Sequence, residues 1–294
     1  MAAPNGILLV DKPGGITSHD VVARARRALN TRKIGHAGTL DPMATGLLIL
    51  GVGPATRLLT YIVGLDKTYA ATIRLGQTTD SDDADGETTG RTDASGVRDD
   101  DIAAAIARLT GPIAQVPSRV SAIKVGGRRA YDLAREGAEV ELKARDVVIS
   151  RFDVIASRAE AGCRDLDVVV DCSSGTYVRA LARDLGADLG VGGHLTVLRR
   201  TRIGGFRIDD AVSVDDLATS GFLTPADVAA RIMPAVHADV DQTRDLRHGK
   251  RVAGLTFDGA RAAAIAPDGA LIGVVERRGA EVKSIMNMPE EQHP

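Results

Sequence analysis

The segment that most constrains this chain is residues 34–46 (IGHAGTLDPMATG), which is rich in glycine and has no hydrophobic periodicity. It lies between apolar stretches, so we expect a loop that its neighbours hold in place. Glycines permit positive φ angles or the close approach of another backbone. Pro42 favours an extended or turn conformation at Asp41. The sequence therefore predicts a rigidly presented Asp41 carboxylate, although an aspartate that only caps a turn fits the same pattern.

Hydrophobic periodicity predicts the regular elements around this loop. Thr17 and Asp20 have the spacing of a capping box at the start of a helix, and 67–75 alternates between apolar and polar residues as a strand does. A helix that begins near Val178 would take its cap from 173–176. The other expected strands are 6–11, 47–50, 147–154, 166–171 and one within 192–202, and the other expected helices are 56–63 and 100–109.

Charge is distributed unevenly along the chain. The formal net charge is −2, yet residues 80–101 hold nine carboxylates and two arginines, which leaves the rest of the chain with a net charge of +5. The overall charge therefore does not exclude a nucleic acid as partner. We expect residues 78–101 to form a long surface loop. Its aspartates either hydrogen-bond bases or only keep the loop in solution; these are Asp80, Asp82, Asp83 and Asp85.

Several common chemistries find no support in the sequence. Gly51–Thr56 lacks the third glycine of a dinucleotide loop, and no phosphate-binding GxxxxGK[ST] motif occurs. The two cysteines, Cys163 and Cys172, lack zinc-site spacing, and the acidic segment lacks the glutamate that ends a calcium loop. No apolar run approaches membrane-spanning length, and residues 1–10 do not read as a signal peptide. We expect a cytoplasmic protein that needs no metal, nucleotide or other cofactor.

Six motifs in order then carry a resemblance. They are GHAGTLDPMATGLL, preceded by LLVDKPGGITSHD and followed by DKTYAATIRLGQTTDSDDADG, PSRVSAIKVGGRRAYDLAREG and CSSGTYVRALARDLG, with GGHLTVLRRTRIGGF after them. Over about residues 5–207 the chain resembles the TruB family of tRNA pseudouridine synthases. This resemblance implies an α+β fold with a mixed, largely antiparallel sheet flanked by helices and loops. It places a catalytic domain at 1–237, with a basic insertion at about 117–145, and a small β-rich, PUA-like RNA-binding domain at 238–294.

The family resemblance also implies an activity. Such enzymes convert the uridine at position 55, in the T-loop of tRNA, to pseudouridine. The N1–C1′ bond breaks, the uracil rotates, and C5 joins C1′, without a cofactor. Because a stacked uridine is inaccessible, the enzyme must flip the base into a pocket. The expected partner is the tRNA T-arm stem-loop, and the expected oligomeric state is a monomer.

The resemblance assigns roles to individual residues. Asp41 matches the catalytic aspartate, which attacks C1′ or C6 or removes the C2′ proton; the sequence does not choose among these. Tyr69 matches the active-site tyrosine that packs on the uracil, and Arg179 matches the arginine that pairs with the catalytic aspartate. Tyr177 would line the pocket, and Leu198 would form an apolar wall for the base.

Two further matches concern binding. His36 would contact displaced T-loop nucleotides, and Lys12 would either support the active-site loop or meet a phosphate. Phosphate contacts would offset the cost of base flipping. The basic residues that we expect to make them are Arg128, Arg129, Lys143, Arg145, Arg199, Arg200 and Arg202.

Three alternatives remain at this point. A guide-RNA-dependent synthase usually carries basic extensions, which this sequence does not show. A non-catalytic RNA-binding or tRNA-folding protein would not need Asp41, Tyr69 and Arg179. A nucleoside hydrolase would need a second acid partner or a metal site, and product analysis would distinguish it.

Overall fold

The computed structural model describes residues 4–118, 124–125, 128–129 and 142–290. The chain forms two compact units. The first comprises residues 1–42, 46–63 and 203–294, and the second comprises residues 43–45 and 64–202.

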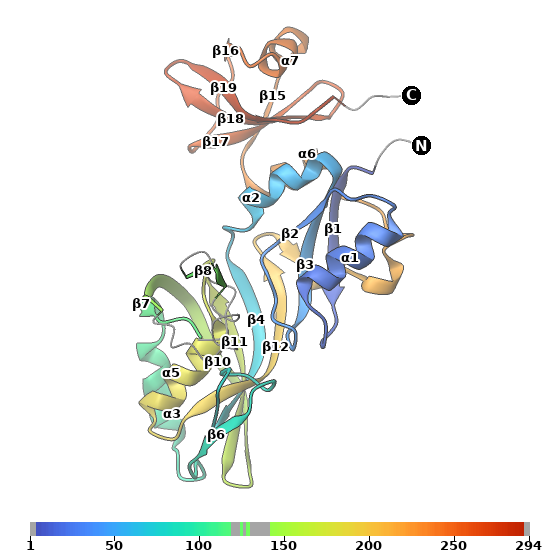
Figure 1. Ribbon diagram of the computed structural model, residues 1–294. Helices are drawn as coiled ribbons and strands as arrows, with labels where there is room; N and C mark the ends of the chain where they lie inside the picture. The colour runs from blue at the N-terminus through green and yellow to red at the C-terminus, as the bar shows by residue number, and fades with distance from the viewer. Residues whose placement is uncertain (1–3, 119–123, 126–127, 130–141, 291–294) are drawn as a thin grey trace. The chain divides into compact units, whose positions relative to one another are not determined.

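The N-terminal part of the first unit is a small sheet covered by one helix (Figure 1). Strand β1 (Gly6–Lys12) pairs antiparallel with β3 (Thr45–Val52), which also pairs with β2 (Ile34–Ala37). Helix α1 (Ser18–Ala28) begins with the predicted capping box, in which Thr17 and Asp20 bond each other's backbone. Its apolar side packs against this sheet in a core that includes Val21, Val22, Ala25, Leu8, Val10, Leu48 and Leu50.

The C-terminal part of the first unit is a second sheet with its own core. The strand order is β15-β17-β18-β19-β16, and α7 packs on it. Helix α6 contacts both β1 and β17, so it joins the two parts of this unit. The elements are η1 (Gly53–Leu58), α2 (Leu59–Ile62), β13 (Phe206–Arg207), η2 (Ile208–Asp210), β14 (Val212–Ser213), η3 (Val214–Asp216), α6 (Pro225–Ile232), β15 (Ala235–His237), α7 (Val240–Arg247), β16 (Arg251–Ala253), β17 (Arg261–Ile265), β18 (Leu271–Arg278) and β19 (Glu281–Asn287).

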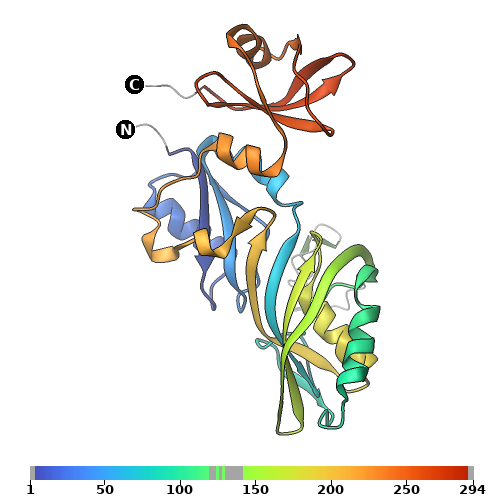
Figure 2. The ribbon, with the colours of Figure 1, turned by 180° about the vertical axis from the view of Figure 1, so that it is seen from behind.

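The second unit is built on long strands in the order β12-β4-β11-β10-β7. In β4 every second residue is buried, as the alternation of 67–75 predicts. Figures 1 and 2 show α3 and α5 together on one side of these strands. The elements are β4 (Lys67–Leu75), β5 (Gln77–Thr79), β6 (Thr88–Arg91), α3 (Asp99–Arg108), β7 (Gly111–Gln115), β8 (Lys124–Val125), β9 (Arg128–Arg129), β10 (Arg145–Glu160), β11 (Cys163–Cys172), α5 (Val178–Asp188) and β12 (Gly193–Ile203).

Helix α5 makes backbone contact with the start of β12 through a glycine. A Cβ atom built on Gly186 would lie 2.2 Å from the carbonyl carbon of Gly192 and 2.2 Å from the nitrogen of Gly193. No real side chain tolerates that distance, so the absence of a Cβ sets how closely the helix approaches the strand.

Four sequence expectations are corrected here. Residues 34–37 are not loop but strand β2, because β3 offers them a pairing edge. Residues 78–101 are not one long loop, since β5 and β6 form a hairpin and α3 begins at Asp99. The expected helix at 56–63 divides into η1 and α2, and the helix α7 was not anticipated. Of the predicted insertion at 117–145, residues 119–123, 126–127 and 130–141 lie outside the described residues.

Candidate active site

The peptide groups on both sides of Asp41 are fixed by hydrogen bonds. The Ser18 hydroxyl accepts from the Leu40 amide at 2.9 Å and lies 3.2 Å from the Leu40 carbonyl, to which it donates. On the other side, the Gly15 amide donates to the Pro42 carbonyl at 2.9 Å. Leu40 is buried, while Asp41 is only half-buried. The Asp41 carboxylate is therefore carried on a backbone that is anchored before and after it.

Lys12 strengthens the same turn from inside. Its side chain is fully buried, and its ammonium donates to the carbonyls of Pro13 (2.9 Å), Ile16 (2.7 Å) and Pro42 (3.2 Å). An ammonium has three N–H donors, which matches these three acceptors. Of the two roles expected for Lys12, this geometry favours support of the loop, because the ammonium is not at the surface where a phosphate would meet it.

His36 lies on β2 and is half-buried. Its ring meets the ring of His19, an exposed residue of α1, edge to face, with 5.4 Å between centroids and 82° between planes. His19 was not singled out by sequence reasoning, since nothing local in the sequence shows that β2 lies beside this face of α1.

Arg179 is buried in the second unit beside an aspartate of the acidic segment. Its Nη1 lies 3.2 Å from the Asp83 carboxylate and donates to the Ser81 carbonyl at 2.8 Å. The side chains of Arg179 and Asp83 are only 4% and 6% exposed. The Asp83 carboxylate also accepts from the Ser81 hydroxyl (2.5 Å) and the Asp85 amide (3.1 Å). Both charges of this buried pair are thus hydrogen-bonded, which is what makes such a pair tolerable.

One turn further along α5, a second arginine contacts the same segment. Arg183 lies 3.4 Å from the Asp82 carboxylate and donates to the Val116 carbonyl at 2.7 Å. The Leu195 amide donates to the Asp82 carbonyl at 3.0 Å. Asp82 and Asp83 are therefore structural parts of the second unit. Sequence analysis missed this role because Arg179 is about a hundred positions from its partner, and no local pattern links them.

Tyr69 and Leu198 are buried, on β4 and β12 respectively. Tyr69 stands opposite Val170 in the register of β4 and β11. Tyr177 is half-buried and is the N-cap residue of α5. No side chain caps this helix, so the expected cap from 173–176 is wrong. Instead the Gln115 amide holds Tyr177, accepting from its N–H at 2.8 Å and donating to its carbonyl at 3.0 Å.

Two buried titratable groups stand opposite each other beside Tyr69. Lys67 pairs with Cys172 in the register of β4 and β11, and the Lys67 ammonium donates to the Leu65 carbonyl at 2.6 Å. Burial, reinforced by the nearby Arg200 charge, lowers the pKa of Lys67 to about 8. Burial likewise raises the pKa of the Cys172 thiol to about 11. Burial therefore disfavours both the charged ammonium of Lys67 and the thiolate of Cys172.

The arginines of β12 differ in exposure. Arg200 is only 1% exposed, which distinguishes it from the phosphate-contacting residue that the sequence led us to expect. Arg199 is half-buried, and its guanidinium lies 3.4 Å from the Thr45 hydroxyl. Arg202 lies 3.4 Å from the Asp171 carboxylate.

The remaining predicted phosphate contacts belong to the predicted insertion. Lys143 and Arg145 are exposed. Arg128 and Arg129 form β9, which pairs with β8. Their contribution to RNA binding stays a prediction.

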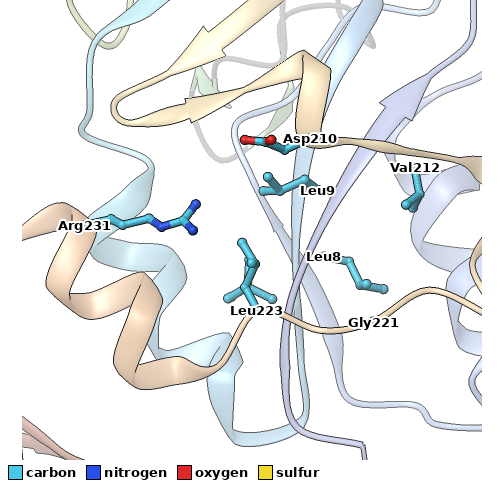
Figure 3. Close-up of a pocket in the computed structure, with 8 residues that line it drawn as sticks. Leu8, Leu9, Asp210, Val212, Gly221, Leu223 and Arg231 are labelled. Carbon is cyan, nitrogen blue, oxygen red and sulfur yellow. The ribbon is translucent and has the colours of Figure 1, made fainter.

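A pocket of about 180 Å³ lies in the first unit, between β1 and the 210–231 segment (Figure 3). Ile7, Leu8 and Leu9 of β1 line it, and Asp210 and Arg231 supply its charged groups. None of the residues assigned by the resemblance lines it. Over the part of the chain that the structure describes, no cluster of three or more His, Cys, Asp or Glu side chains could hold a metal ion. Within those same residues, no helix is long and apolar enough to cross a bilayer.

Comparison with known proteins identifies the family. Residues 26–178 match the N-terminal domain of the TruB family pseudouridylate synthases. Residues 179–235 match a C-terminal domain of tRNA pseudouridylate synthase B, and residues 233–289 match the C-terminal domain of tRNA pseudouridine synthase II. The chain belongs to the TruB family. It is a tRNA pseudouridine synthase, an isomerase, as the resemblance implied.

Curated relatives match over almost the whole length. The tRNA pseudouridine synthase B of Leifsonia xyli subsp. xyli is 52% identical, and the match covers 98% of each chain. The protein of the same name from Rhodococcus jostii is 53% identical, over 96% of this chain and 93% of the relative.

Solved structures confirm the fold class. A chain of the Cbf5-Nop10-Gar1 complex superposes with a TM-score of 0.74 at 24% identity, covering 99% of this chain and 87% of that one. A chain of an H/ACA RNP bound to a substrate RNA gives a TM-score of 0.72 at 24% identity, covering 98% and 86%. At this identity the likeness shows the fold alone: a mixed α+β TruB-type fold with a β-rich C-terminal domain.

Proposed function

We propose that this TruB-family enzyme isomerises the uridine at position 55, in the T-loop of tRNA, and that Asp41 is its catalytic residue. The observation that supports this most is the anchored turn: Ser18, Gly15 and Lys12 fix the peptide groups around a carboxylate that is itself half-buried. A group fixed before the substrate arrives needs no rearrangement during the reaction, which lowers the barrier to a bond-making step.

Asp41 would act on the ribose or the uracil of a flipped nucleotide. A carboxylate can act in such a step as a nucleophile or as a base. The glycosidic bond breaks, the uracil rotates, and the C1′–C5 bond forms, after which C5 loses its proton to water. The isomerisation balances without any oxidant, reductant or group donor.

Tyr69 and Arg179 would complete the chemistry. We propose that Tyr69 packs against the uracil, and that Leu198 and Tyr177 help to enclose it. Arg179 would orient the catalytic carboxylate, and its guanidinium is itself oriented by Asp83 and the Ser81 carbonyl. His36 would contact the T-loop nucleotides displaced by flipping.

The decisive test uses a T-arm RNA hairpin labelled with tritium at uridine C5. The wild type should release the label to water, and digestion of the RNA should yield pseudouridine. Asp41→Asn should lower the rate at least about a thousand-fold. Asp100→Asn, which alters an exposed carboxylate of the same kind, should react at the wild-type rate.

Two outcomes would contradict the proposal. If the wild type binds the hairpin but releases no label, the chain acts on this RNA only as a binding or folding protein. If free uracil appears in place of pseudouridine, the chain is a hydrolase. A control hairpin carries cytidine in place of the uridine at position 55. Formation of pseudouridine in this control would refute position 55 as the target.

A further inference from the structure

Helix α1 and the loop after it carry a run of positive charge that the proposed catalytic site does not use. From Val21 to Leu40 the chain contains four arginines and one lysine but no aspartate or glutamate. The net charge of the whole chain is −2, so this segment differs sharply from the average. We define the basic face as Arg24, Arg27, Arg32 and Lys33.

All four side chains of the basic face are exposed. Among the described residues, none of them lies within 4.0 Å of a carboxylate. Elsewhere on the described surface, exposed arginines commonly do have an aspartate partner: these include Arg98, Arg108, Arg151, Arg158, Arg207 and Arg244. Arg24 still interacts electrostatically with the Asp20 carboxylate, one turn earlier on α1, so the charge of the basic face is only partly compensated.

The apolar side of α1 determines which way these arginines point. Val21, Val22 and Ala25 pack into the core, so Arg27 falls on the opposite side of the helix and Arg24 on its flank. The buried side of α1 packs against the core of the sheet. The arginines are thus not needed to hold α1, since the helix already has its core contacts and its capping box.

The basic face continues to the residue proposed to bind T-loop nucleotides. Arg26, between Arg24 and Arg27, donates to the Ile34 carbonyl at 3.1 Å, which ties the helix to β2. His36 is two residues further along β2 and contacts His19 of the same helix. A polyanion that reaches His36 would therefore find the basic face on the neighbouring surface of the same unit.

We propose that the basic face binds the phosphate backbone of the RNA stem next to the loop that holds the target uridine. This inference rests on the proposed function. Guanidinium groups match phosphate oxygens with paired N–H donors, and such contacts position a nucleic acid without reading its sequence. No large exposed hydrophobic side chain lies on residues 18–33. Protein and membrane partners usually require such apolar anchors, so an RNA backbone fits this surface best.

The test neutralises the basic face and compares it with a matched loss of charge elsewhere. The face variant carries Arg24→Gln, Arg27→Gln, Arg32→Gln and Lys33→Gln, because glutamine preserves helix propensity. The control variant carries Arg98→Gln, Arg151→Gln, Arg207→Gln and Arg244→Gln, which removes the same charge from exposed positions. Circular dichroism and Tm check that both variants fold.

Binding of unmodified full-length tRNA is then measured between about 50 and 300 mM salt. Each lost phosphate contact should reduce the slope of log K against log salt by about 0.7 to 0.9, so four lost contacts reduce it by about 3. At the lowest salt the face variant should bind at least about ten-fold more weakly than the control. Its single-turnover rate at saturating RNA should equal that of the control.

Equal slopes and affinities for the two variants would refute RNA binding by the basic face and leave the proposed function intact. A wild type that binds tRNA but forms no pseudouridine would overturn the proposed function. The binding comparison would still show whether the basic face binds the RNA backbone. A face variant that binds normally but reacts slowly would also overturn the proposal, since it would place these residues in the chemical step.

Discussion

The Asp41 turn and the surroundings of Arg179 hold two proposed active-site residues by opposite means. At Asp41 the backbone is fixed by near neighbours and by a buried lysine, and the side chain is carried along. At Arg179 the side chain itself is held, by a carboxylate about a hundred positions away. The first arrangement lies between Lys12 and Pro42, with partners 22 to 30 positions apart. The second depends on the fold bringing an acidic segment against α5. A substitution in the Asp41 turn should therefore cause a moderate loss of stability, and loss of one partner of the Arg179–Asp83 pair should cause a large one.

The largest effect is expected at the long-range pair. Asp83→Ala leaves a buried guanidinium without its carboxylate, and this should lower the free energy of unfolding by about 3 to 5 kcal/mol. Urea denaturation measures the loss. Asp100→Ala removes an aspartate from an exposed pair with Arg98 and should cost less than about 1 kcal/mol. Equal stabilities of the two variants would show that burial does not distinguish the pairs.

A smaller effect is expected at the lysine behind the Asp41 turn. Lys12→Met removes a charged donor from three carbonyls and should cost about 2 to 3 kcal/mol of stability. Because the turn loosens while the binding surface stays, kcat should fall more than KM rises. Lys250→Met, at an exposed lysine, is the control. A pure KM effect of Lys12→Met would instead support the phosphate-contact alternative.

Ser18→Ala tests the other anchor of that turn. It leaves the buried Leu40 amide without its acceptor and should cost about 1 kcal/mol. Tritium release should slow modestly, by less than for Lys12→Met. Ser150→Ala, at an exposed serine, should change neither quantity. If Ser18→Ala stops the reaction outright, the two anchors do not act as separate, additive supports.

The smallest effect concerns pH. Lys67 has a folded-state pKa of about 8, below its ordinary value of 10.5. Between these values the unfolded chain binds more protons than the folded chain, so Lys67 makes stability rise with pH. Wild type should gain about 1 kcal/mol relative to Lys67→Met between pH 8 and pH 9. A stability difference that stays constant across this range would show that Lys67 titrates normally.

Sequence reasoning succeeded where local rules decide the structure. The Thr17–Asp20 capping box and the alternation of 67–75 both depend on neighbours within a few residues, and the structure confirms both. It failed where tertiary contacts decide. Residues 34–37 become a strand only because β3 is beside them. The acidic segment was expected to be solvated, but Asp83 is buried because Arg179 neutralises it.

The same contrast between local sequence and tertiary contacts applies to the candidate site. The family motifs single out Asp41, Tyr69 and Arg179, whose roles stay predictions, but they do not reveal the residues that hold them: Ser18 and Asp83 came only from the structure. Arg200 shows the limit of counting charges, since a basic residue in a basic strand proved to be buried. Charge in a sequence does not tell which side of a strand carries it.

The glycine contact between α5 and β12 has a consequence for how this protein can change over generations. Side-chain packing normally lets neighbouring elements drift apart or together as residue volumes change. At Gly186 the helix rests directly on the backbone of Gly192 and Gly193, so no exchange of side-chain volumes elsewhere compensates for a substitution there. The helix that carries Arg179 is thereby tied to the strand that carries Leu198.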